Sequence, residues 1–173
     1  MTQTLGDPIL ARRALEFARS DVPYNTKSTT FRWLGAGISR KAYLGPDGIV
    51  YKVGGRSDND IEYRAMRALA PLCENHPEFG VPMVSQCDIV NPYPNDPTER
   101  QYLQCVSVIA AEYIKGEETW HLDSYGNEDD ESHISFRAEE FFGTSDLHSG
   151  NVQSYRGKYY VLDLGFSKFG VVK

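Results

Sequence analysis

Three side chains that carry oxygen atoms able to bind a metal ion follow one another at short intervals near the end of the sequence. Asp146 and Asn151 belong to the segment SDLHSGN at residues 145–151, and Asp163 follows Asn151 by twelve residues in the segment LDLG at residues 162–165. Carboxylate and carboxamide oxygens are hard ligands of the kind that Mg²⁺ takes, and a carboxylate also accepts the proton of a hydroxyl group. The combination is suited to metal-assisted transfer of a group to a hydroxyl.

Two glycines and a lysine in the first third of the sequence are suited to an anionic ligand. Gly35 and Gly37 lie between predicted strands in the segment LGAGISRKAY at residues 34–43, where backbone N–H groups can approach phosphate because no side chain intervenes. Lys52 follows in an otherwise apolar strand, whose alternation aims this side chain at the underside of the glycine turn. Taken alone, these features are also explained by a hairpin turn and a solvent-facing lysine.

Glu62 lies ten residues after Lys52, in the first turn of a predicted helix. From there its carboxylate can pair with the lysine ammonium group and hold it in place. The alternative explanation is that an acidic residue near a helix N-terminus is favourable in itself.

Taken together, these residues resemble the protein-kinase-like superfamily over about residues 30–170. The segment DLHSGN is similar to the kinase catalytic loop H-R-D-L-x-x-x-N, and closer to the D-L-H-x-G-N form of aminoglycoside phosphotransferases and other atypical kinases. The resemblance implies an α+β, protein-kinase-like fold with a five-stranded antiparallel N-lobe sheet and one helix in residues 1–116. It implies a strongly truncated C-lobe in residues 117–173, because the sequence stops eight residues after Gly165.

The resemblance assigns the oxygen-bearing residues their roles. Asp146 would be the catalytic base, and Asn151 and Asp163 would hold Mg²⁺, which bridges phosphate oxygens. The histidine of D-L-H loops is structural in this family, so His148 receives no catalytic role. Thr144 and Ser145 replace the His-Arg pair before the catalytic aspartate, so regulation through an activation-loop phosphate is not expected.

The resemblance also implies how ATP is held. Lys52 would contact the ATP phosphates and pair with Glu62, and Gly35 and Gly37 would cover the phosphates, with Arg40 in place of the third glycine of the family pattern.

The segment AEYIKG at residues 111–116 resembles the kinase hinge. Main-chain groups near Glu112 and Ile114 would hydrogen-bond adenine, and Ala111 would guard the back of the adenine pocket. An ordinary strand end is the alternative explanation for this segment.

Hydrophobic periodicity and turn residues predict the elements that position these groups. An amphipathic helix capped by Asp7 leads the chain, a second helix is capped within residues 58–60 and stopped by Pro71, and a third covers residues 132–142. Strands are predicted at residues 29–34, 41–44, 49–53, 83–90 and 102–112, followed by a hairpin of residues 151–155 and 158–162.

Composition limits the class of protein. A chain of 173 residues with 40% hydrophobic residues can fold as a globular protein, and its net charge of −6 argues against a nonspecific binder of nucleic acid or of an anionic membrane. The sequence shows no apolar run long enough to span a bilayer and no signal-peptide layout, so we expect a cytoplasmic protein. Three cysteines at irregular spacing indicate buried free thiols.

Three functions remain open at this point. The first is a minimal kinase, dependent on Mg²⁺ and ATP, that phosphorylates a protein hydroxyl or itself, because every catalytic position holds the required residue type. The second is a catalytically silent nucleotide-binding module that engages a partner protein or forms a homodimer. The third is phosphorylation of a small molecule, as in the aminoglycoside kinases. The compact sequence would suit a phage protein.

Overall fold

The chain divides into two compact units. The computed structural model describes residues 5–19, 30–37, 40–87, 106–119, 137–145, 147–148 and 150–171. Unit 1 comprises Met1–Asp60 and Val84–Tyr113, and unit 2 comprises Ile61–Met83 and Ile114–Lys173. The lobe boundary predicted after residue 116 remains a prediction. None of the described helices is long and apolar enough to cross a membrane.

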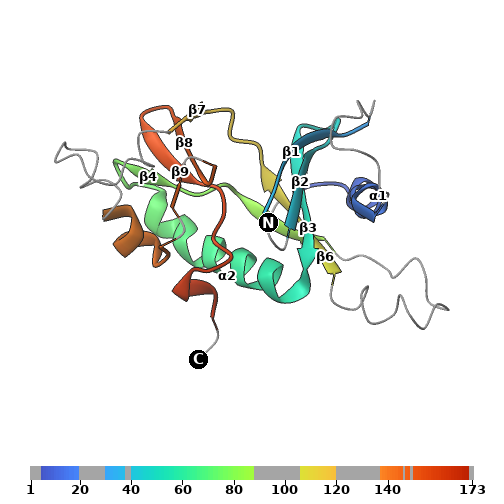
Figure 1. The fold of residues 1–173 in the computed structure, drawn as a ribbon. Helices are drawn as coiled ribbons and strands as arrows, with labels where there is room; N and C mark the ends of the chain where they lie inside the picture. Colours follow the sequence, from blue (N-terminus) through green and yellow to red (C-terminus); the bar gives the residue numbers. More distant parts are fainter. Residues whose placement is uncertain are drawn as a thin grey trace. The chain divides into compact units, whose positions relative to one another are not determined.

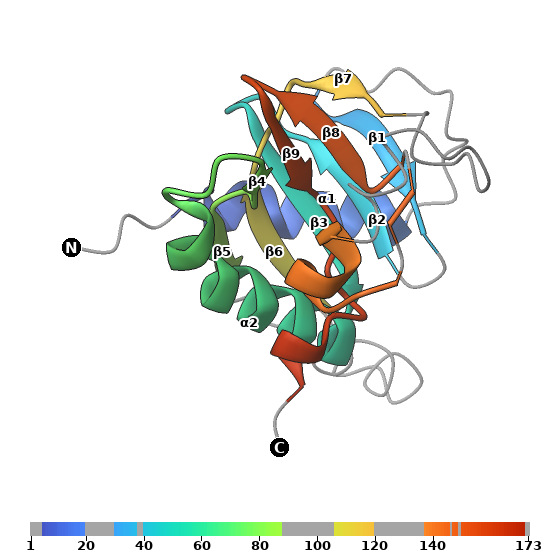
Figure 2. The same ribbon diagram turned by 90° about the vertical axis from the view of Figure 1, so that its left-hand side faces the viewer.

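Unit 1 is built on a five-stranded antiparallel sheet with the strand order β1-β2-β3-β6-β5. Its strands are β1 (Arg32–Ala36), β2 (Arg40–Leu44), β3 (Ile49–Gly55), β5 (Val84–Cys87) and β6 (Val106–Glu112) (Figures 1 and 2). The sheet confirms the predicted α+β class and the five antiparallel strands. The outer parts of the predicted strands, at residues 29, 88–90 and 102–105, lie outside the described residues.

Helix α1 (Pro8–Arg19) begins as predicted, with Asp7 as its N-cap. The Asp7 side chain accepts a hydrogen bond from the Ile9 N–H at 2.8 Å, which satisfies one of the amides left free at a helix start. Figure 2 shows α1 lying across β3 and β6. The helix and this face of the sheet share a core of Ala11, Ala14, Leu15, Phe31, Tyr43, Tyr51, Val53, Cys87, Val108 and Ala110. Since side chains alternate along a strand, Lys52 belongs to the opposite face.

The segment before α1 is fastened to the same core by hydrogen bonds. The Leu5 N–H donates to Ser85 Oγ at 2.8 Å, and the Asp7 N–H donates to the hydroxyl of Tyr51 at 2.9 Å. Tyr51 in turn donates to Asp47 Oδ2 at 2.6 Å. Burial raises the pKa of Tyr51 well above its ordinary value, and the bond to Asp47 raises it further, so the hydroxyl remains a donor.

Gly6 sits between these hydrogen bonds with a φ of +82°. A Cβ atom at this position would lie 2.6 Å from the Cβ atom of Ala110. We therefore expect Gly6→Ala to lower the free energy of unfolding by about 3 kcal/mol, through left-handed backbone strain and steric overlap together. Urea denaturation measures this loss.

The matched control is Gly48→Ala, because Gly48 has a similar φ of +78° but open space around a Cβ atom. It should lose only the backbone part, about 1–2 kcal/mol. Equal losses in the two variants would show that the residue-6 segment does not pack on Ala110.

Unit 2 contains a four-stranded sheet with the order β4-β9-β8-β7. Its strands are β4 (Phe79–Gly80), β7 (Glu117–Glu118), β8 (Val152–Tyr155) and β9 (Lys158–Val161) (Figure 2). The predicted hairpin is present as β8 and β9, and its turn residues Arg156 and Gly157 both have positive φ, as a two-residue hairpin loop of type I′ requires. The two-residue strands β4 and β7 were not predicted.

Helix α2 (Arg56–Cys73) differs from its predicted bounds at both ends. It begins two residues before the predicted cap at residues 58–60, and it continues through Pro71 instead of stopping there. A proline in the last turn costs the helix only one backbone hydrogen bond, and Pro71 is exposed. Lys158 Nζ donates to the Cys73 carbonyl at 3.2 Å and so satisfies a free carbonyl at the helix end.

The third predicted helix is present at residues 137–142, and residues 132–136 lie outside the described part of the chain.

Candidate functional site

Lys52 lies in the middle of β3, in line with the glycine segment. It pairs with Ala42 of β2 and with Ile109 of β6, and Ala42 pairs with Gly35 of β1. A register shift between Trp33 and Gly35 produces this alignment, since unbroken pairing would set residue 34 opposite Ala42. Residues that pair directly across neighbouring strands point to the same face of the sheet. Lys52 therefore lies in the same cross-strand row as Gly35, two strands away and on the same face.

The fold itself gives no reason for glycine at positions 35 and 37. Neither residue has a positive φ, and a Cβ atom added to either would meet no atom within 4 Å. The Gly37 N–H donates to the Arg40 carbonyl at 2.9 Å, and residues 38–39 between them lie outside the described residues. Open space beside an ordinary backbone suits the close approach of a ligand to main-chain N–H groups.

Lys52 and Glu62 differ in their environment. Lys52 is half-buried, and Glu62 is fully buried at 0% exposure. A carboxylate without access to water needs a cation or hydrogen-bond donors beside it. The two residues belong to different units, and their pairing remains a prediction.

The predicted hinge begins where β6 ends, at Glu112. Ala111 is 2% exposed and pairs with Val50 of β3, two positions along from the pair of Lys52 and Ile109, so it lies on the Lys52 face. The chain passes from unit 1 to unit 2 between Tyr113 and Ile114. The adenine contacts assigned to Glu112 and Ile114 remain predictions.

A contact that sequence reasoning missed joins the first strand to this segment. Arg32 of β1 donates to the Tyr113 hydroxyl at 2.6 Å, and the guanidinium carbon lies 5.4 Å from the centroid of the tyrosine ring. A charged hydrogen bond and a cation–π contact on one pair restrain Tyr113 between the two predicted adenine contacts. No local pattern indicates a contact between residues 81 positions apart.

In unit 2, the register of the hairpin brings Asn151 and Asp163 to one end of β8 and β9. Val152 pairs with Val161, and beyond this pair the Leu162 N–H donates to the Asn151 carbonyl at 2.7 Å. Asp163 is the next residue, and its Oδ1 atom accepts a hydrogen bond from the Gly165 N–H at 3.0 Å. The two predicted metal ligands therefore lie on neighbouring strand ends, twelve residues apart in sequence.

Of the loop before Asn151, the structure describes the residues on either side of Asp146 but not Asp146 itself. His148 Nδ1 accepts a hydrogen bond from the Gly150 N–H at 3.1 Å, and the His148 carbonyl accepts one from the Asn151 N–H at 2.8 Å. These bonds hold the turn that leads into Asn151. They give His148 a structural role, and the expectation that it has no catalytic role remains a prediction.

The segment that follows Asp163 is anchored within unit 2. Ser167 Oγ donates to the Phe142 carbonyl at 2.6 Å, and the Lys168 N–H donates to the Gly143 carbonyl at 2.9 Å. A Cβ atom at Gly170 would overlap the Ile61 carbonyl oxygen. Asp163 is thus fixed from both sides of its position in the chain.

The donor set fits a magnesium ion shared with phosphate. Among the described residues there is no group of three or more His, Cys, Asp or Glu side chains that could hold a metal ion alone. Mg²⁺ in nucleotide sites uses one or two protein oxygens together with phosphates and water, which the Asn151 and Asp163 oxygens match. The two cysteines that the structure describes, Cys73 and Cys87, are buried free thiols, as expected, and burial raises the pKa of Cys73 to about 11. Cys105 lies outside the described residues.

Comparisons with known proteins give only distant similarities. No protein-family model and no curated protein matches the sequence. The chain is similar to the erythromycin complex of Rv3197 from Mycobacterium tuberculosis, with 15% identity, a TM-score of 0.47, and coverage of 90% of this chain and 55% of the other. It is also similar to the aminoglycoside phosphotransferase APH(2″)-IIa in complex with streptomycin and ATP, with 14% identity, a TM-score of 0.39, and coverage of 94% and 73% respectively. At this level of similarity neither structure identifies a family for the chain.

Proposed function

We propose that the protein binds ATP with Mg²⁺ and transfers the γ-phosphoryl group to a hydroxyl. The observation that carries the proposal is the row in the unit 1 sheet that sets Lys52 level with Gly35 on one face. A cation facing the start of an open glycine segment is a site for phosphate, because the ammonium group and main-chain N–H groups converge on the same anion.

Asn151 and Asp163 would supply the oxygen ligands of the metal. Bound Mg²⁺ neutralises charge on the phosphate oxygens during transfer. The hydrogen bonds that hold the Asn151 backbone and the Asp163 carboxylate support this role, since a site held in advance loses little freedom on binding. Asp146 would accept the proton of the attacking hydroxyl.

Glu62 would pair with Lys52 and keep its ammonium group on the phosphates. Its complete burial supports the assignment, because a buried carboxylate is stabilised by an opposite charge. Main-chain groups at Glu112 and Ile114 would hold adenine, next to the restrained Tyr113.

The acceptor that we propose is a hydroxyl group of a protein, or of the chain itself. Phe166, three residues after Asp163, is 72% exposed, and Val171 in the same segment is 59% exposed. Exposed apolar side chains favour a protein over a small polar acceptor, because a protein surface would cover them. The homodimer, the cytoplasmic location and the phage origin remain predictions.

A paired measurement on purified protein tests the proposal. Thermal denaturation with and without Mg-ATP reports binding, and transfer of label from γ-³²P-ATP to the chain or to a mixed protein substrate reports catalysis. We expect both a raised melting temperature and labelled protein. A raised melting temperature without labelled protein would favour the catalytically silent nucleotide-binding module. An unchanged melting temperature would show that the proposed nucleotide site is wrong.

We expect Gly35→Ala and Gly37→Ala to weaken Mg-ATP binding about tenfold or more while leaving the free energy of unfolding within about 0.5 kcal/mol. The physical reason is that an added methyl group meets nothing within the protein but occupies the space through which phosphates reach the backbone. Isothermal titration and urea denaturation measure the two quantities.

Gly157→Ala provides the opposite pattern as a control. Gly157 has a φ of +77° in the β8–β9 turn and open space around it, so alanine should cost about 1–2 kcal/mol of stability and leave binding unchanged. If Gly35→Ala and Gly37→Ala bind Mg-ATP as the parent does, the glycine segment does not contact the phosphates.

A further inference from the structure

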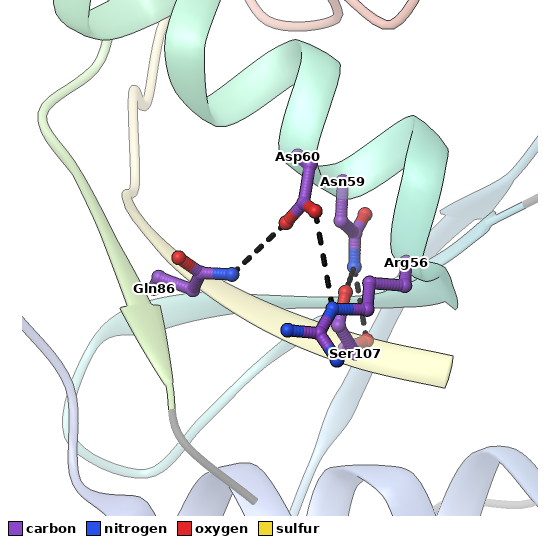
Figure 3. A network of polar contacts seen from close by, with 5 residues as sticks. All are labelled: Arg56, Asn59, Asp60, Gln86 and Ser107. Carbon is purple, nitrogen blue, oxygen red and sulfur yellow. Dashed lines mark hydrogen bonds and ion pairs between the residues drawn. The ribbon is translucent and has the colours of Figure 1, made fainter. Parts of the chain in front are cut away.

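Asn59, in the first turn of α2, is fully buried at 0% exposure. Its Nδ2 atom lies 2.9 Å from the Ser107 carbonyl oxygen and 2.9 Å from Ser107 Oγ (Figure 3). The same atom lies 3.3 Å from the Lys52 carbonyl oxygen. Two main-chain carbonyls can be approached only by a donor, which fixes the orientation of the amide. Asn59 therefore joins the start of α2 to both central strands, β3 and β6.

The other end of the same amide is unsatisfied. Asn59 Oδ1 is buried, and it has no hydrogen-bond partner among the described residues. A buried acceptor without a partner is unfavourable, so an apolar side chain of similar size would suit packing at this position better. We therefore explain the presence of an amide at this position by the hydrogen bonds that its Nδ2 atom donates. One of these bonds goes to the main-chain carbonyl of Lys52.

The next residue continues the attachment on the outside of the helix. Gln86 Nε2 of β5 donates to Asp60 Oδ1 at 2.9 Å, and Arg56 Nε lies 3.9 Å from Asp60 Oδ2 (Figure 3). The first turn of α2 is thus bonded to three strands of the unit 1 sheet. A slide of the helix by one residue, about 1.5 Å, would break the buried bonds of Asn59.

We infer that Asn59 is a positioning residue for phosphoryl transfer, which acts through Lys52. By holding the Lys52 carbonyl it fixes the backbone of β3 to the first turn of α2, and Glu62 follows Asn59 by three residues in the sequence. The inference rests on the proposed function.

The test compares Asn59→Leu, which keeps the volume and loses the donors, with two controls. Ser107→Ala removes one acceptor and leaves both carbonyls, and Asp60→Asn keeps the bond from Gln86 and loses the charge opposite Arg56. We expect Asn59→Leu to lower the kcat of phosphoryl transfer about tenfold to a hundredfold with a smaller change in the KM for ATP. Both controls should stay within about twofold of the parent, since each keeps the bond to Lys52.

Amide hydrogen exchange gives a readout that does not need activity. In Asn59→Leu we expect faster exchange at Lys52 and its neighbours in β3, with the exchange of α1 unchanged. Should Asn59→Leu not fold, Asn59→Ala serves in its place, because it removes the donors without adding bulk or charge. Unchanged exchange at Lys52 together with an unchanged kcat would overturn the inference.

The two proposals fail in different ways. If the parent protein neither binds Mg-ATP nor transfers phosphate, the proposed function is wrong. If the parent transfers phosphate and Asn59→Leu does so at the same rate, the proposed function stands and the role of Asn59 is wrong.

Discussion

Lys52→Met and Asp163→Ala are each expected to abolish the stabilisation of the protein by Mg-ATP. A ligand at a hundred times its Kd stabilises a protein by about 2.7 kcal/mol, and this whole shift should disappear in both variants. Methionine keeps the length of the Lys52 side chain but removes the cation proposed to hold the phosphates, and Asp163→Ala removes a proposed charged ligand of the metal. Thermal denaturation across a range of Mg-ATP concentrations measures the effect.

Arg67→Met and Glu74→Ala are matched controls, because both side chains are exposed and neither belongs to the site. They should respond to Mg-ATP as the parent protein does. A full Mg-ATP response in Lys52→Met and Asp163→Ala as well would remove both residues from the nucleotide site.

Asp146→Asn is expected to separate catalysis from binding. Asparagine keeps the shape and hydrogen-bonding capacity of the side chain but cannot accept the hydroxyl proton, so transfer should fall by about a hundredfold or more. The affinity for Mg-ATP should stay within about twofold, because Lys52, Asn151 and Asp163 are the residues proposed to hold the phosphates and the metal. Single-turnover transfer of label and isothermal titration measure the two effects.

Ser145→Ala, a change at the exposed preceding residue, should leave both quantities unaltered. Transfer at the parental rate in Asp146→Asn would show that another group takes the proton.

The parts of the fold that could be predicted from sequence are those with a local signal. Strand alternation and the turn at Arg156 and Gly157 are enough to predict the β8–β9 hairpin, and the register of that hairpin brings Asn151 and Asp163 together. The strands β4 and β7 have two residues each, which is too short for any periodic pattern. They form because neighbouring strands offer backbone partners, a condition that only the folded chain meets.

The bounds of α2 could not be predicted because tertiary contacts override local preference. The run of polar residues at 58–60 has the composition of a helix cap, yet the helix already begins at Arg56. Asn59 is used instead as a buried donor to Lys52 and Ser107, the latter 48 positions away in sequence. A capping signal and a tertiary hydrogen bond use the same residue types, and the sequence does not distinguish them.

The residues of the candidate site were easier to predict from the sequence than the contacts that position them. Gly35, Lys52, Asn151 and Asp163 were selected by residue type and spacing, and the structure aligns the first two across one sheet and the last two at one hairpin end. The contact between Arg32 and Tyr113 and the hydrogen bonds that Asn59 donates were not predicted, because both depend on the order of the strands in the sheet. Strand order is not encoded in any single segment of the chain.

The central proposal is that Gly35, Gly37, Asn151 and Asp163 contact ATP and its metal ion, and paramagnetic broadening tests it most directly. Mn²⁺ replaces Mg²⁺ in many oxygen-ligand sites and broadens the NMR signals of nearby nuclei. With ATP present, the account predicts selective broadening at Asn151 and Asp163 and at the backbone of Gly35 and Gly37, and much weaker broadening with Mn²⁺ alone. Broadening that ignores ATP, or that spares Asn151 and Asp163 when ATP is present, would contradict the account.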